Sequence, residues 1–314
     1  MRKAKIAVIG ANGQLGSEIV NVIGSNPKYS DMSVTAFVHD KCDVADYPLR
    51  DSCLCVKHID VCDLNRIRNH IMYFDVVINT AAYHNVAACE KNPDIAYDVN
   101  TTGSCNVAER CQETSARYVL ISTDYVFGSE PSYDEEVGYL PECHRNPMNV
   151  YGRSKSIAEE TALERCYRPL IARCSSLYGG TCRGKPGDNI IDWLYNALTN
   201  GETINAYCNT AITLTYAHQA AIRLMEQLFV DSYANSYGGC IHLNDSGIVS
   251  HYDVAKFMAE LLNINDANIV PTTCKQGIKP LKTPLQPLDG SLNWKTSLTQ
   301  YLTFKGWYHK DEVS

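Results

Sequence analysis

The stretch that decides the fold class lies near the beginning of the chain and reads Ile6-Ala7-Val8-Ile9-Gly10-Ala11-Asn12-Gly13-Gln14-Leu15-Gly16. Four consecutive apolar residues are typical of a buried parallel strand, and three glycines follow with the spacing G-x-x-G-x-x-G. Glycine allows a tight turn and a close approach of the backbone to a phosphate, and the N-terminus of a helix attracts an anion. The stretch therefore predicts a strand, a phosphate-binding turn and a helix.

The same alternation of strand and helix continues through the first half of the chain. We expect short, apolar, often β-branched strands at 4–9, 33–39, 75–80, 117–123 and 169–175. We expect helices between them at 14–24, 63–72, 93–114 and 151–166. Such an alternation predicts an α/β fold with a doubly wound parallel sheet, the Rossmann arrangement.

The second half of the chain is less regular. Helices are expected near 189–199, 216–230 and 251–263 and a strand near 240–243, whereas four prolines make 271–290 loop-like. We expect residues 1–175 together with about 206–243 to form a dinucleotide-binding domain. Residues 176–205 together with 244–314 are then expected to form a smaller lobe that binds the substrate.

Composition and charge exclude several classes of protein. The 314 residues are 45% hydrophobic and 20% charged, which is ordinary for a globular chain, and the net charge of −7 argues against a nucleic-acid partner. The sequence has no apolar stretch of the roughly 20 residues that cross a bilayer, and no signal peptide. The 14 cysteines are scattered without a C-x-x-C pair, so we expect reduced thiols and no metal site. These features predict a cytoplasmic protein with no membrane attachment.

The residues after the second strand bear on the choice of dinucleotide. An acidic side chain there binds the ribose of NAD, whereas a basic side chain accommodates the extra phosphate of NADP. The chain reads Val38-His39-Asp40-Lys41, in which His39 and Lys41 suit a phosphate and Asp40 suits a ribose. We therefore favour NADP(H), with NAD(H) as the alternative. Further along, Asp60 is expected near the adenine end of the cofactor, and Asp63 is equally well explained as a helix N-cap.

Candidate catalytic residues lie at a predicted helix start and at a predicted strand end. Tyr151 and Lys155 have the spacing Y-x-x-x-K, which places both on one face of a helix, and a nearby ammonium is expected to lower the pKa of the phenol. Thr123 ends the strand at 117–123, where its hydroxyl is expected to hydrogen-bond a substrate carbonyl beside Tyr151.

Together these motifs resemble the extended short-chain dehydrogenase/reductases, and more narrowly the dTDP-4-dehydrorhamnose reductase family. The resemblance covers nearly the whole chain. Its matching segments are 10–16, 79–83, 90–93, 122–127, Pro147, 151–155, 173–178 and 286–293. It implies Thr123, Tyr151 and Lys155 as the catalytic residues. The cofactor contacts that we expect are Gly10, Asn12, Gly13, Gln14, Leu15, Gly16, His39, Asp60, Ala81, Ala82, Tyr83 and Lys155.

The sequence departs from the pattern of this family on the substrate side. His84 and Ala87 stand where the family usually has a threonine and an aspartate, and Ser176 stands where a tryptophan is frequent. The run 209–215 replaces a segment that lines the sugar-nucleotide pocket. These departures leave the reductase chemistry intact and the identity of the sugar open.

The resemblance implies an NAD(P)H-dependent oxidoreductase that reduces a 4-keto deoxysugar nucleotide, with a hydride from the nicotinamide and a proton from Tyr151. A homodimer is one expected assembly. A sugar-nucleotide epimerase on the same scaffold remains an alternative, since the same three residues suit transient oxidation. A dehydratase is disfavoured, because Tyr125 stands where the base for elimination is needed. The third alternative is a non-catalytic subunit like the one that regulates methionine adenosyltransferase.

Overall fold

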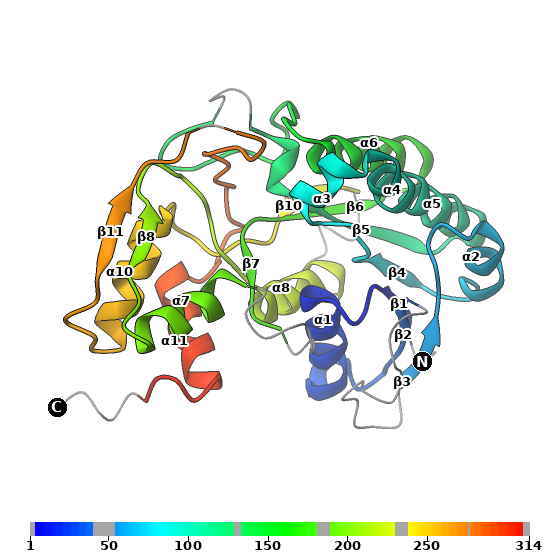
Figure 1. Cartoon of the computed structure of the whole chain (residues 1–314). Coiled ribbons are helices and arrows are strands. Elements are labelled where there is room, and N and C mark those ends of the chain that lie inside the picture. Colours follow the sequence, from blue (N-terminus) through cyan, green and yellow to red (C-terminus); the bar gives the residue numbers. More distant parts are fainter. Residues whose placement is uncertain are drawn as a thin grey trace.

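A seven-stranded parallel sheet forms the centre of the protein, with the strand order β3-β2-β1-β4-β5-β6-β10 (Figure 1). The computed structural model describes residues 4–39, 54–128, 133–180, 189–229, 238–275 and 277–309. The strands are β1 (Ala4–Ile9), β2 (Met32–Val38), β3 (Leu54–His58), β4 (Val76–Asn79), β5 (Arg117–Thr123), β6 (Leu170–Cys174) and β10 (Gly239–His242). The order reverses between β1 and β4, which opens a crevice at the carboxyl ends of these strands. The predicted doubly wound α/β class is confirmed.

Helices cover both faces of the sheet: alternate residues of β1 point to opposite faces, and the last four, Ile6 to Ile9, are all buried. Ile6 and Val8 pack with α1 (Gln14–Ser25) and α8 (Ala217–Phe229). Ala7 and Ile9 belong to the core on the other face. The helices of that face are α2 (Leu64–His70), α5 (Gly103–Thr114) and α6 (Val150–Arg165), and Figure 1 shows them on the side opposite α1 and α8.

The helix predicted at 93–114 is divided in the structure. It begins as α4 (Pro93–Tyr97), passes through a π-helical segment at Asp98–Thr102 and continues as α5. Such π segments occur frequently at functional sites, and this one carries the buried Asn100. The π-helical segment therefore marks Asn100 as a residue to examine for a functional role.

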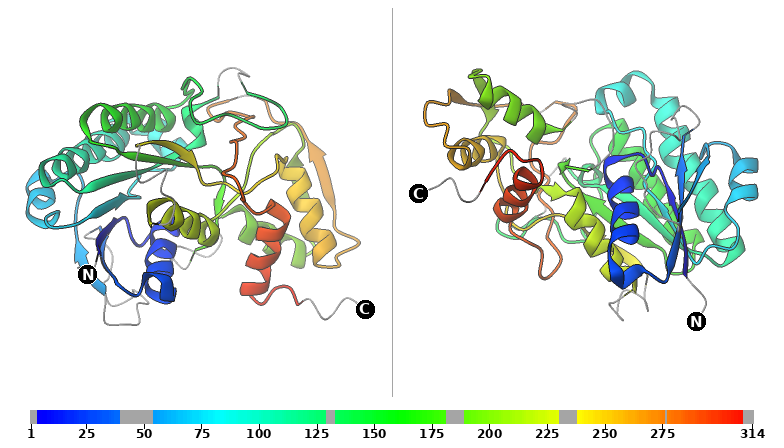
Figure 2. Two further views of the ribbon diagram at one scale, coloured as in Figure 1. Left: turned by 180° about the vertical axis from the view of Figure 1, so that it is seen from behind. Right: turned by 90° about the horizontal axis from the view of Figure 1, so that it is seen from below.

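A second hydrophobic core lies beside the sheet, at the end away from β3 (Figure 2). Its elements are β7 (Leu177–Tyr178), α7 (Ile190–Thr199), β8 (Ile204–Tyr207), β9 (Thr215–Tyr216), α10 (His251–Leu261), β11 (Ile269–Thr272) and α11 (Trp294–Phe304). Ala206, Ile212 and Leu214 pack into this core, whereas Ala220 belongs to the core of the sheet. We therefore propose two lobes whose boundary lies near residue 216 rather than near 206.

Several elements of the described chain were not predicted. They are the strands β3, β7, β8, β9 and β11, the short helix α3 (Val86–Lys91), and α11. β8 pairs with β11, and the last two residues of β11 fall in the stretch expected to be a loop. Pro271 is tolerated in β11 because the strand has a single partner in a two-stranded sheet. The inward face of α11 carries Trp294, Leu298 and Tyr301 at helical spacing, so the signal for this helix was present in the sequence.

The described residues also bear on the expectations about metals, thiols and membranes. Eleven cysteines lie among them and all are free thiols. No group of three or more His, Cys, Asp or Glu side chains in the described ranges could hold a metal ion. Within the same ranges no helix has the length and apolar character needed to cross a membrane.

Candidate active site

The turn between β1 and α1 has the geometry that its three glycines predict. Gly10 adopts φ +75°, and a Cβ there would lie 2.7 Å from Thr80 Oγ1 and 2.8 Å from the Ala81 nitrogen. A Cβ on Gly16 would lie 2.4 Å from the Gly10 carbonyl oxygen. Gly13 is the N-cap of α1, and no side chain caps this helix end. The N-terminus of α1 is therefore open to an anionic ligand at the carboxyl edge of the sheet.

Ala81 lies directly beside this turn, after the end of β4, and is followed by Ala82 and Tyr83. Asn100 holds this segment, since its Oδ1 accepts from the Tyr83 N–H at 2.8 Å and its Nδ2 donates to the Tyr83 carbonyl at 3.0 Å. The same Nδ2 donates to Ser154 Oγ on α6 at 3.0 Å. Asn100 thus joins the segment beside the glycine turn to the helix that carries Tyr151 and Lys155.

His39 and Asp60 meet at the ends of β2 and β3. Their side chains are exposed, with His39 Nε2 4.0 Å from Asp60 Oδ2. Asp60 also accepts a hydrogen bond from the Cys62 N–H at 2.9 Å. Asp63 accepts from the N–H groups of residues 65 and 66 and so is the N-cap of α2. Asp40 and Lys41 lie outside the described residues.

A close approach of α6 to the end of β5 brings Tyr151 to Thr123. The N-cap Asn149 accepts from the Gly152 N–H at 2.7 Å, and a Cβ on Gly152 would lie 2.1 Å from the Tyr125 carbonyl oxygen. Only glycine permits this contact. The Tyr151 hydroxyl then hydrogen-bonds to Thr123, and the rings of Tyr125 and Tyr151 meet edge to face with centroids 6.3 Å apart.

Burial dominates the ionisation of both Tyr151 and Lys155. It raises the pKa of Tyr151 above its usual value, and the hydrogen bond with Thr123 opposes this only in part. Lys155 is not among the groups that shift the pKa of Tyr151, so the expected lowering by the ammonium is not observed. Burial lowers the pKa of Lys155 itself to about 8, against an opposing effect of Glu159. Tyr151 is therefore protonated at neutral pH, and Lys155 is largely cationic.

Lys155 Nζ is buried and has no hydrogen-bond partner among the described residues. A buried ammonium without a partner is costly, and a native structure retains one where a ligand completes its contacts. Lys155 lies on α6 one turn after Tyr151, so its unpartnered ammonium belongs to the same site as the Tyr151 phenol.

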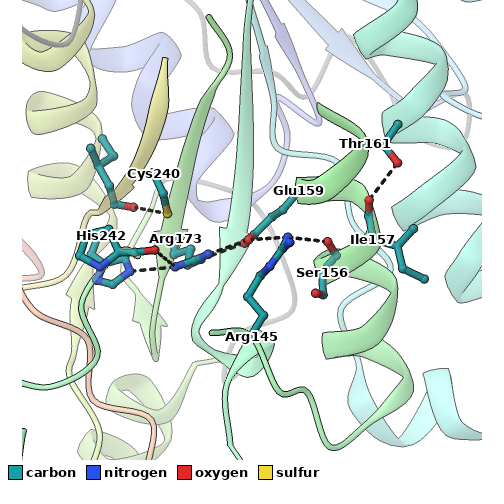
Figure 3. A network of polar contacts seen from close by, with 10 residues as sticks. Arg145, Ser156, Ile157, Glu159, Thr161, Arg173, Cys240 and His242 are labelled. Atoms are coloured by element: carbon teal, nitrogen blue, oxygen red, sulfur yellow. Dashed lines mark hydrogen bonds and ion pairs between the residues drawn. The ribbon is translucent and has the colours of Figure 1, made fainter. Parts of the chain in front are cut away.

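An ion-pair network centred on Glu159 fixes α6 against the sheet (Figure 3). Glu159 is fully buried and accepts from Arg173 of β6 at 2.9 and 2.7 Å, with Arg145 at 3.4 Å. Arg173 also donates to His242 of β10 at 3.3 Å. Burial lowers the pKa of His242 to about 3, so the ring is neutral, accepting through Nε2 and donating through Nδ1 to the Gln286 carbonyl. The network ties α6 to two strands and to the C-terminal segment.

A cavity of about 570 Å³ opens next to Tyr125, between the sheet and the second core. Tyr125, Asp124 and Thr283 form part of its wall near the catalytic residues. Its other wall includes Trp193, Tyr207, Thr210, His251, Lys275 and Lys279. The volume suits a ligand of the size of a small organic molecule or nucleotide.

The structure brings together the predicted catalytic residues and the glycine turn at one edge of the sheet. Of the run 209–215, Thr210 and Ile212 line the cavity. The structure adds residues that no motif indicated. Asn100 lies inside a helical pattern, and Trp193, His251, Lys275 and Lys279 come from segments far apart in the sequence. A polar residue at a buried helix position was the one available signal for Asn100.

Comparison with known proteins gives a match along most of the chain. The family model described as RmlD substrate binding domain matches residues 4–304. The chain is 29% identical over 270 residues to "Probable low-salt glycan biosynthesis reductase Agl14" of Haloferax volcanii, covering 85% of this chain and 82% of that protein. It is 25% identical over 280 residues to a "dTDP-4-dehydrorhamnose reductase" of Mycolicibacterium smegmatis, covering 89% of this chain and 76% of that protein.

The fold is similar to that of solved structures. A crystal structure of a dTDP-4-dehydrorhamnose reductase from Bacillus anthracis in complex with NADP matches with a TM-score of 0.78. The two chains are 24% identical, and the match covers 97% of this chain and 99% of that one. This likeness concerns the fold of both the sheet and the second core.

Proposed function

Since the chain belongs to the RmlD substrate binding domain family, we propose that it is an NADP(H)-dependent reductase of a 4-keto deoxysugar nucleotide. The names of the relatives support a reductase, and the NADP complex of the Bacillus anthracis protein supports the cofactor. The observation that carries the proposal is the arrangement of three residues: Tyr151 packs against Tyr125 beside the cavity, and the buried, unpartnered ammonium of Lys155 lies one turn further along α6.

The residues present fit a dinucleotide. The glycine turn forms a cradle that any Cβ would fill, and the unpartnered ammonium of Lys155 requires a further acceptor. The turn 10–16 and the N-terminus of α1 would hold the pyrophosphate. His39 and Asp60 would face the adenosine end, and Ala81, Ala82, Tyr83 and Lys155 would hold the nicotinamide half.

When bound, the reduced dinucleotide supplies a hydride to the keto carbon of the substrate. Tyr151 donates its proton to the keto oxygen as negative charge develops there. The raised pKa of Tyr151 suits this role, because the phenol begins the reaction protonated. Lys155, one helical turn further along α6, would act through its buried ammonium, which has no partner among the described residues and would hold the nicotinamide half of the cofactor.

The names of the relatives favour a reductase over an epimerase. An epimerase on the same scaffold remains an alternative, since Thr123, Tyr151 and Lys155 also suit a transient oxidation. A dehydratase is disfavoured by Tyr125, whose ring packs against Tyr151 and carries no carboxylate. A non-catalytic regulatory subunit remains the alternative from another class.

We also propose a cytoplasmic location and a homodimer, in keeping with the expectations from the sequence. Size-exclusion chromatography with light scattering measures the assembly directly, and a mass of about 35 kDa, that of one chain, would contradict the dimer.

The test is NADPH oxidation with a panel of 4-keto deoxysugar nucleotides. Tyr151→Phe keeps the ring and removes the proton, so kcat is expected to fall roughly 10²–10⁴-fold with little change in NADPH affinity. Tyr167→Phe removes a hydroxyl from an exposed ring and is the matched control. Thr123→Val is expected to cost less than Tyr151→Phe, because the acid remains.

Full activity in Tyr151→Phe would remove the assignment of Tyr151. NADPH binding without turnover of any sugar nucleotide would favour the regulatory alternative instead.

A further inference from the structure

The carboxyl group of Asp124 is buried immediately after Thr123 and is surrounded by hydroxyl groups. Its Oδ1 accepts from Thr123 Oγ1 at 3.0 Å. Its Oδ2 accepts from Ser175 Oγ at 2.9 Å and from Thr283 Oγ1 at 2.6 Å. These hydroxyls come from the end of β5, from the residue after β6 and from the C-terminal segment. No ion pair to Asp124 is present among the described residues, so neutral donors alone hold it.

The hydrogen bonds of Asp124 fix the direction in which the Thr123 hydroxyl donates. An ionised carboxylate only accepts hydrogen bonds, and a threonine hydroxyl has a single proton. That proton is committed to Asp124, so Thr123 Oγ1 can only accept from its other neighbours. It does accept from the Tyr125 N–H at 3.2 Å. In this state Thr123 cannot donate to a substrate oxygen.

A protonated Asp124 reverses the direction. The acid O–H then donates to Thr123 Oγ1, and the threonine proton becomes free to point at the keto oxygen beside Tyr151. We propose that Asp124 is a positioning residue that acts through Thr123, withholding the threonine proton when ionised and releasing it to the substrate when protonated. The proposal rests on the proposed reductase function. It adds that the charge of Asp124 decides whether Thr123, the second donor beside Tyr151, can donate to the keto oxygen.

The groups around Asp124 bring its protonation into the pH range in which activity can be measured. Burial raises the pKa of Asp124 to about 6, and its three hydrogen bonds oppose the effect only in part. The ionisable groups beside it are Tyr125, Tyr151 and Cys174. Burial raises the pKa of all three, that of Cys174 to about 12, so they remain neutral. Lys155, next to Cys174, changes charge at higher pH, with a pKa of about 8.

The expected consequence is a step in kcat. A donor aimed at developing negative charge contributes on the order of 10²-fold to the rate. The rate is therefore expected to be higher below the pKa of Asp124 and to fall as pH rises through it. A residue with a purely structural role would produce no such step.

The kinetic experiment measures kcat for NADPH oxidation from about pH 5 to 7.5 in the wild type, Asp124→Asn and Ser175→Ala. The asparagine cannot take up or release a proton. Its carbonyl oxygen is expected to accept from Ser175 and Thr283, as Oδ2 does, so that its amide donates to Thr123 Oγ1 like the protonated acid. This variant is therefore expected to lose the step and to show the low-pH rate throughout, while any titration of substrate or cofactor persists. Ser175→Ala removes one donor to Oδ2, so the step is expected to move to higher pH.

A second measurement does not depend on turnover. The carboxyl ¹³C resonance of Asp124, identified by its absence in Asp124→Asn, is expected to titrate near pH 6 in labelled protein and at higher pH in Ser175→Ala. If no sugar nucleotide is reduced but this titration is found, the proposed function fails and the control by Asp124 stands. Titration near 3.8, the ordinary value for an aspartic acid, or an unchanged step in Asp124→Asn, would overturn the inference.

Discussion

Replacing Lys155 by methionine is expected to stabilise the protein while it removes function. Lys155 is 1% exposed, its ammonium has no hydrogen-bond partner among the described residues, and burial lowers its pKa from 10.5 to about 8. Methionine has a similar length, adapts to irregular space and carries no charge that must be desolvated. The substitution therefore separates the cost of burying the ammonium from the packing of its stem.

The magnitude follows from the two pKa values. The difference between 10.5 and about 8, at about 1.4 kcal/mol for each pH unit, gives about 3 kcal/mol as the cost of the buried charge. Between these values the unfolded chain binds the proton more tightly than the folded chain does. The cost is therefore fully present below pH 8 and disappears as pH rises toward 10.5. For a chain of 314 residues, about 3 kcal/mol corresponds to about 5 °C in the midpoint of thermal unfolding.

The assay is thermal unfolding without cofactor at pH 7 and pH 10, together with NADPH titration at pH 7. Lys155→Met is expected to unfold about 5 °C above the wild type at pH 7 and at nearly the same temperature at pH 10. Its affinity for NADPH is expected to fall. Lys91→Met at the exposed end of α3 removes the same charge without burial and is expected to show no pH-dependent difference. A lower midpoint for Lys155→Met at pH 7, or a difference independent of pH, would refute the reasoning.

Three further predictions concern the cofactor turn, the ion-pair network and cofactor choice. Gly16→Ala is expected to destabilise the fold and to abolish NADPH binding, because its Cβ would lie 2.4 Å from the Gly10 carbonyl oxygen. The control Gly24→Ala lies on the same helix, and its Cβ would meet nothing within 4 Å. This control is expected to bind NADPH normally in a fluorescence titration. Glu159→Gln leaves the buried charge of Arg173 without its partner and is expected to lower the free energy of unfolding by about 3–5 kcal/mol, measured in urea. The control Glu160→Gln changes an exposed residue of the same helix and is expected to change this free energy by less than about 0.5 kcal/mol. His39→Ala is expected to weaken NADPH binding more than NADH binding, and equal weakening would contradict a role for His39 at the extra phosphate.

The fold class was predictable because its signals are local. The apolar run 6–9, the glycine spacing and the strand–helix alternation each involve residues close in sequence, and period and turn chemistry depend on local geometry. Several of the missed elements are very short strands, such as β7 and β9 with two residues each, whose local pattern is weak. The π-helical segment at Asp98–Thr102 was missed for another reason, since the sequence around it is that of a continuous helix.

The catalytic residues were likewise predictable from spacing and from their positions at strand and helix ends. Their ionisation was not. Y-x-x-x-K spacing suggested a lowered pKa for Tyr151, whereas burial by residues from distant segments raises it. Desolvation depends on everything packed around a group, so no short motif carries that information.

The sequence by itself therefore determined the parallel sheet, the phosphate-binding turn, and the identity of Thr123, Tyr151 and Lys155 as candidates for catalysis. Only the tertiary structure decided how protons are held at the site. Ser175 and Thr283 meet on one oxygen of Asp124 although 108 residues separate them in the chain (283 − 175). Hydrogen-bond direction and desolvation depend on three-dimensional proximity, which chain position does not encode for segments that far apart.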